Sequence, residues 1–277
     1  MRILSTVLVS SLVLLSSFAV AQEKEGQKPD APKGAPPIPG ALSKDEMLKL
    51  LQEQDDRQRN GGDYKALAYL EQKEKDKADV VRELIIFRRD ADDKLMLLFT
   101  KPKSEEGKGY LRLDKNLWSY DPGTGKWERA TERERIGGTN SRRSDFDESR
   151  LAEEFEPKFC GTEKLGKFET VCLELTVKPG IDVAYPVIKL WLDTVNHNQL
   201  KRQEFALSGR LMRTAYYPKW QKLFSESKKS DVWFPGEMRF FDEVEKSNST
   251  LVLMKSVDLS NLENNMFTKA WLESKSR

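Results

Sequence analysis

Few residues in this chain have the types and spacing that covalent chemistry needs. Ser225 and Lys228 have the Ser-x-x-Lys spacing in which a lysine can assist a serine nucleophile, but the Ser-Asp-Asn and Lys-Thr-Gly motifs of such enzymes are absent from the sequence. His197 is the only histidine, so the chain lacks a second imidazole for a typical zinc site and offers no convincing Ser-His-Asp triad. We interpret Ser225–Lys228 as a polar loop and His197 as part of a turn. The sequence therefore predicts no catalytic residue, no metal site and no cofactor.

The two cysteines are the remaining chemically distinctive pair. Cys160 and Cys172 are equidistant from Gly166, the expected turn residue of a hairpin, so antiparallel pairing sets them directly opposite each other. A catalytic thiol is the alternative, but no neighbouring residue in the sequence supplies a base. In an oxidising compartment we expect a disulfide, which would stabilise the fold by about 3 kcal/mol at most.

The strands that would carry this pair lie in the stretch Thr170 to Tyr217. From Val171 to Val177 the odd positions are all apolar and the even positions are Cys, Glu and Thr, which predicts a strand with one buried and one wet face. A second strand is expected at Val187 to Leu192, and Lys201 to Tyr217 is expected to fold back at Ser208-Gly209. The pattern is that of an antiparallel meander.

Three segments are expected along the chain. Residues 1–21 combine Arg2, an apolar run and a small-x-small site ending at Ala21, which predicts a signal peptide cleaved after Ala21 and export to the periplasm. Residues 22–42 hold five of the twelve prolines and few apolar side chains, which predicts a flexible linker. Residues 43–277 form the folded domain.

The folded domain is expected to be mainly β, in the α+β class. Ser43 and Glu46 have capping-box spacing and begin a helix, and Ser144 and Asp147 are expected to cap a shorter one that contains Leu151. About ten or eleven strands surround these helices. Because 47 Lys plus Arg nearly balance 45 Asp plus Glu, we expect no nucleic-acid surface.

A series of short motifs in this order resembles the LolA/LolB-like superfamily of outer-membrane lipoprotein-sorting proteins. The resemblance spans roughly Ser43 to the C-terminus, and its individual motifs are turn and strand chemistry. They are Gly109-Tyr110-Leu111-Arg112, Leu117-Trp118-Ser119-Tyr120-Asp121-Pro122, Trp127-Glu128-Arg129, Ser144-Asp145-Phe146, Leu173-Glu174-Leu175-Thr176, Leu190-Trp191-Leu192-Asp193 and Ser208-Gly209-Arg210-Leu211.

The resemblance implies an unclosed antiparallel β-barrel whose open side is covered by helices and whose apolar cavity takes acyl chains. Combined with the strand patterns, it gives eleven candidate residues for the cavity wall. They are Leu84, Ile86, Leu95, Leu97, Leu111, Leu113, Leu173, Leu175, Ile188, Leu190 and Leu192. Plain core packing is the alternative role for each of them.

The implied function is transfer of a lipoprotein or another lipid to the outer membrane, without bond making. The implied partners are that cargo, an inner-membrane transporter or outer-membrane acceptor, and a membrane contacted transiently by a monomer. Two alternatives remain at this point. An envelope assembly or binding module would have a packed barrel and a protein partner, and a periplasmic hydrolase would have acidic or Ser-Lys groups clustered in a cleft.

Overall fold

The structure is a computed structural model, and it describes residues 42–59, 61–131, 134–139, 143–145 and 149–276. The expected signal peptide and nearly all of the expected linker lie outside these residues. All described residues fall in one compact unit, residues 37–277. None of the described helices is long and apolar enough to span a membrane.

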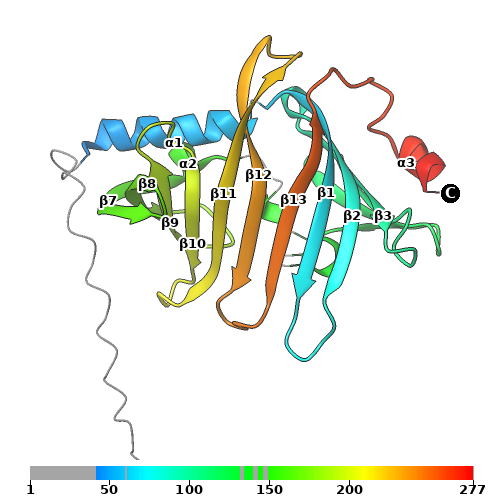
Figure 1. The fold of residues 1–277 in the computed structure, drawn as a ribbon, viewed down its shortest axis with the longest axis horizontal. Coiled ribbons are helices and arrows are strands. Elements are labelled where there is room, and N and C mark those ends of the chain that lie inside the picture. The colour runs from blue at the N-terminus through cyan, green and yellow to red at the C-terminus, as the bar shows by residue number, and fades with distance from the viewer. Residues whose placement is uncertain (1–41, 60, 132–133, 140–142, 146–148, 277) are drawn as a thin grey trace, which may run out of the picture. The chain divides into compact units, whose positions relative to one another are not determined.

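A single antiparallel sheet of thirteen strands dominates the described residues (Figure 1). Its spatial order is β6-β5-β4-β3-β2-β1-β13-β12-β11-β10-β9-β8-β7. The strands are β1 (Asp63–Lys73), β2 (Val80–Arg89), β3 (Lys94–Lys101), β4 (Gly109–Leu113), β5 (Asn116–Asp121), β6 (Lys126–Arg129), β7 (Phe155–Leu165), β8 (Phe168–Val177), β9 (Val187–Asp193), β10 (Gln199–Phe205), β11 (Leu211–Ser225), β12 (Ser230–Asp242) and β13 (Ser249–Asp258).

The mainly β class and the unclosed antiparallel sheet are confirmed, but ten or eleven strands is too few. The edge strand β7 has few apolar residues, so its sequence gives little alternation from which to count it. The helices among the described residues are α1 (Lys44–Arg59), α2 (Leu151–Glu154) and α3 (Lys269–Lys275), with 3-10 turns η1 (Asp90–Asp92), η2 (Ile136–Gly138) and η3 (Arg143–Asp145).

The start of α1 is the predicted capping box. Glu46 N–H donates to Ser43 Oγ at 3.3 Å, and Ser43 N–H donates back to Glu46 Oε2 at 2.7 Å. These two bonds satisfy backbone donors that have no partner inside the helix. Hydrogen bonds from Ser43 also hold the pKa of Glu46 below its usual value.

The two edges of the sheet, β6 and β7, are consecutive strands. The described parts of the chain between them are residues 130–131, 134–139, 143–145 and 149–154, and we call them the connection. We call the sheet face that this connection covers the inner face, and the opposite one the outer face.

Three apolar clusters hold the fold. The central cluster lies on the inner face around Leu84, Ile86, Leu95, Leu97 and Phe99, and Ala130 and Ile136 of the connection pack into it. The helix cluster also lies on the inner face, where Met47 and Leu51 of α1 and Leu151 beside it cover β8 and β9. The outer cluster joins Phe87, Met96 and Leu111 to Phe267 and Leu272, so α3 covers the outer face and not the open side.

The predicted disulfide between Cys160 and Cys172 is present. The two cysteines are not directly opposite, however, because Gly161 pairs with Cys172 and the register shifts between Phe159 and Gly161. Cys160 is thus an additional bulge residue in β7, which the sequence pattern could not reveal. The bond joins the edge strand to its only neighbour in the sheet.

Candidate functional site

Nine of the eleven candidate wall residues lie on the inner face of the sheet. Antiparallel partners point to the same side, and the pairs Ile86–Leu97, Leu173–Leu190 and Leu175–Ile188 follow this rule. All nine are at most 4% exposed. Four of them, Leu84, Ile86, Leu95 and Leu97, belong to the central cluster, and five, Leu173, Leu175, Ile188, Leu190 and Leu192, belong to the helix cluster.

Leu111 and Leu113 do not share this face. Leu111 pairs with Met96, which alternates with Leu95 and Leu97 along β3 and therefore points outward. Both residues pack in the outer cluster beneath α3. The sequence gives β4 an apolar face, but its neighbour β3 is buried on both faces and so does not indicate to which side of the sheet that face belongs.

A buried band of charge separates the two inner clusters. Arg213 of β11 is 4% exposed, and its guanidinium contacts Asp145 of η3 at 2.6 and 2.7 Å and Glu204 of β10 at 3.3 Å. Burial opposes the charged form, but the carboxylates of Asp145 and Glu204 outweigh it and raise the pKa of Arg213 above its usual value. Burial also raises the pKa of the neighbouring Tyr217 to about 12.

The connection between β6 and α2 is held on the inner face by polar contacts as well as by Ile136. Arg135 forms an ion pair with Asp242 at 3.1 Å, and the side-chain amide of Gln72 donates to the carbonyl of Gly138 at 2.9 Å. Gly137 approaches the sheet so closely that a Cβ there would lie 2.7 Å from Phe99 Cζ, and its φ of 57° is one that glycine adopts readily. These contacts tie three sheet strands, β1, β3 and β12, to the connection.

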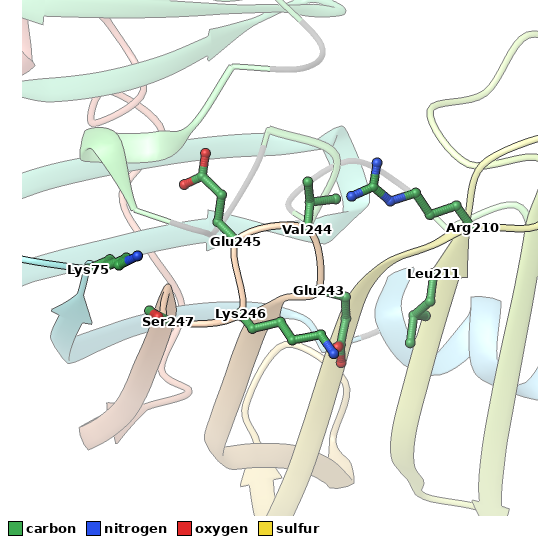
Figure 2. Close-up of a pocket in the computed structure, with 8 residues that line it drawn as sticks. All are labelled: Lys75, Arg210, Leu211, Glu243, Val244, Glu245, Lys246 and Ser247. Atoms are coloured by element: carbon green, nitrogen blue, oxygen red, sulfur yellow. The ribbon is translucent and has the colours of Figure 1, made fainter.

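A cavity of about 740 Å³ opens where the turns of three neighbouring hairpins meet. Figure 2 shows Arg210 and Leu211 beside the loop Glu243 to Ser247, with Lys75 across from it. The lining includes the cations Lys75, Arg210 and Lys246 and the anions Glu243 and Glu245, so charges of both signs surround this cavity. None of the eleven candidate wall residues lines it.

A second cavity, of about 670 Å³, lies across the start of β10 and the middle of β11 to β13, and none of the candidate wall residues lines it. Within the described residues, the apolar side chains of the inner face pack on one another and on the connection.

Ser225 and His197, the residues considered for covalent chemistry, make contacts that connect parts of the fold. Ser225 is fully buried, and its hydroxyl accepts a hydrogen bond from the backbone N–H of Lys228 at 3.4 Å. His197 Nδ1 lies 2.8 Å from Glu53 Oε2, which joins α1 to the β9–β10 turn. No group of three or more His, Cys, Asp or Glu side chains that could hold a metal occurs in the part of the chain that the structure describes.

Comparison with known proteins adds a family and a fold. The family model described as "-like: Uncharacterized protein" matches residues 91–274, which is more than half of the chain. The chain belongs to this family. No curated protein matches the chain by sequence.

Solved structures identify the fold. A domain described as an outer membrane lipoprotein-sorting protein from Vibrio parahaemolyticus matches with a TM-score of 0.70 and 19% identity, covering 82% of this chain and 97% of that one. A LolA superfamily protein from Nitrosomonas europaea matches with a TM-score of 0.65 and 19% identity, covering 83% and 100%. A DUF1329 family protein from Desulfovibrio piger matches with a TM-score of 0.71 and 16% identity, again covering 83% and 100%. The predicted resemblance to the LolA/LolB-like superfamily is confirmed at the level of the fold.

Proposed function

We propose that this protein is a periplasmic carrier that binds the acyl chains of a lipoprotein or another lipid on the inner face of the sheet and transfers them to the outer membrane. The observation that carries the proposal is the covering of that face. Its apolar side chains are buried by a connection between two sheet edges and by α1, where a closed barrel would bury them against further strands. The likeness in fold to a lipoprotein-sorting domain supports the same function.

An acyl chain could replace the apolar contacts that the connection makes on the inner face. Ala130 and Ile136 are each about 1% exposed and pack in the central cluster, so their places are apolar positions that a hydrocarbon chain could occupy. Each methylene buried there would contribute about 0.8 kcal/mol. In the proposed mechanism the connection moves away from the sheet as the acyl chain enters.

The polar contacts of the connection determine how readily it would move. The pairs Arg213–Asp145 and Arg135–Asp242 join it to β11 and β12. If the connection moves, Arg213 keeps its contact with Glu204 at 3.3 Å, and water can solvate Arg135, whose side chain is 35% exposed, so the two ion pairs favour the closed position without fixing it. The charge band also divides the inner face. An acyl chain would therefore enter the central cluster and not the helix cluster, which α1 covers.

The direct test is to purify the protein without detergent, extract it and identify co-purifying lipids by mass spectrometry. A fluorescent fatty acid is then titrated into wild type, Leu97→Asn and Leu98→Asn, with folding checked by circular dichroism. Leu97 points inward and its neighbour Leu98 outward, so Leu97→Asn should lose most of the probe binding and Leu98→Asn should keep it.

The second candidate function is an envelope binding module with a packed barrel, and it is favoured by the filled inner face. Absence of both co-purifying lipid and probe binding would disprove the carrier proposal and leave this module. Equal loss of probe binding in the two folded variants would place the binding site elsewhere.

A further inference from the structure

Four neighbouring strands are bulged at one place. Register shifts make Leu200 an additional residue of β10, and the same holds for Lys255 of β13. Between β11 and β12 the register shifts twice, around Pro218 and around Gly236. All four positions line the cavity of about 670 Å³. Bulges concentrate next to functional sites because they redirect side chains, and here four of them shape one surface that we call the bulged groove.

The bulged groove opens on the outer face. Its residue Leu253 pairs with Glu237, and both alternate with Met238 and Val252, which pack in the central cluster on the inner face. No described helix lies over β10 to β12 there, since α3 packs against the outer cluster. The groove is therefore separate from the proposed lipid-binding face, and the inference does not depend on the carrier function.

Aromatic and aliphatic side chains form the floor of the bulged groove. Trp220, Trp233, Phe168 and Leu253 are partly exposed, and Leu200 is 6% exposed. The indole N–H of Trp220 donates to the carbonyl of Gln199 at 3.0 Å, which fixes its ring across β10 and β11. Rigid aromatic groups on a partly exposed surface are typical centres of protein interfaces.

The rim of the bulged groove is cationic. Lys167, Lys219 and Lys255 line it from the β7–β8 turn, β11 and β13, and all three are exposed. The only carboxylate among the lining residues that the structure describes is Asp193, which is 2% exposed and accepts hydrogen bonds from three backbone N–H groups of its own turn. Glu237, which is not among the lining residues, pairs with Lys219 at 2.6 Å and also with Arg239 at 2.6 Å, so it balances only one of these charges and the field above the floor stays positive.

We propose that the bulged groove binds an acidic segment of a partner protein that places an apolar or aromatic side chain on the tryptophan floor. Lysines on three sides of the floor fit several carboxylates of an extended chain. Exposed lysines around the floor, with no exposed carboxylate among the described lining residues, favour an acidic ligand over a neutral glycan. A flat lipid surface could not reach a recessed floor.

The test uses a displayed library of random dodecapeptides selected on the full-length exported protein. Peptides enriched on wild type should combine Asp or Glu with an aromatic residue. The best of them, labelled with a fluorophore, is titrated by anisotropy against Lys167→Glu/Lys255→Glu and against the control Lys103→Glu/Lys126→Glu, which changes the same charge elsewhere on the surface. Reversing the charge of the two groove lysines should weaken binding of the peptide by about tenfold or more, and the control variant should weaken it less than about twofold.

A third variant, Trp233→Ser, tests the floor and should weaken binding with its salt dependence unchanged. Phosphatidylglycerol vesicles and a polygalacturonate oligosaccharide are measured in parallel. Three results would overturn the proposal. The enriched peptides could lack acidic residues, or peptide binding could weaken equally in the groove variant and the control variant. The third is groove-dependent binding of only the vesicles or only the oligosaccharide.

Discussion

Among single residues, Glu237 shows how the outer face holds a buried charge. It is 2% exposed, and its carboxylate accepts from Lys219 at 2.6 Å and from Arg239 at 2.6 Å. The hydrogen bond from Lys219, with the weaker help of Arg239, outweighs burial and keeps the pKa of Glu237 below its usual value. An acid with a lowered pKa stabilises the fold above its unfolded-state pKa and loses that contribution as pH falls through the folded-state value.

Lys219→Met should therefore raise the pKa of Glu237 toward the ordinary value for glutamate. The variant should also be less stable than wild type at neutral pH, and the difference should shrink as the pH falls below about 4. NMR titration of the Glu237 carboxyl and urea unfolding at several pH values measure both effects. Lys222→Met is the control, since Lys222 pairs with the exposed Asp231. An unchanged pKa in Lys219→Met would contradict this account.

Among the secondary-structure elements, α2 depends on a residue of α1. Asp55 is 1% exposed, and its carboxylate accepts from the N–H groups of Leu151 at 2.8 Å and Ala152 at 2.9 Å and from Ser149 Oγ at 2.5 Å. Asp147 lies outside the described residues, as does the side chain of Ser144, so the cap predicted from them is not tested. Asp55 is the cap that the structure describes, and it joins the two helices over β8 and β9.

Asp55→Ala should lower the free energy of unfolding by about 1–3 kcal/mol, because it leaves buried N–H groups at the start of α2 without an acceptor. The neighbouring Asp56 is exposed and provides a matched control, so Asp56→Ala should change stability by less than about 0.5 kcal/mol. Urea unfolding followed by circular dichroism measures both. A similar small effect of the two changes would show that the carboxylate of Asp55 does not hold the helices together.

For the whole molecule, the carrier proposal requires space on the inner face for an acyl chain once the connection has moved away. Ala66 and Ala68 are small residues in the central cluster, at most 1% exposed. In a permanently packed core, a larger side chain there would cause overpacking, which typically costs about 1–3 kcal/mol. In a carrier, the same side chain would occupy space that cargo uses.

Under the carrier proposal, Ala68→Leu should lower stability by less than about 1 kcal/mol and weaken fatty-acid binding severalfold. Thermal unfolding and probe titration measure the two effects, with Ala270→Leu on the exposed side of α3 as the control. A loss of about 2–3 kcal/mol together with unchanged probe binding would show that the inner face is a core only.

The sequence by itself determined the local features of this protein. Period-two alternation located the strand from Val171 to Val177, which lies within β8, and the strand expected at Val187 to Leu192 is β9 to within one residue. The capping box placed the start of α1. The disulfide partners followed from the position of one turn. Each of these depends on residues close together in the chain, where alternation and turn chemistry act directly.

Only the tertiary structure decided which apolar residues share a face and what covers them. It separated Leu111 and Leu113 from the other candidates, brought Arg213 to Asp145, and aligned four bulges in one groove. The register of each strand depends on that of its neighbour. One additional residue, such as Cys160 or Leu200, therefore changes which residues of the adjacent strand the following residues pair with. Such non-local pairing leaves no periodic pattern in the sequence, and it is what forms both the inner face and the bulged groove.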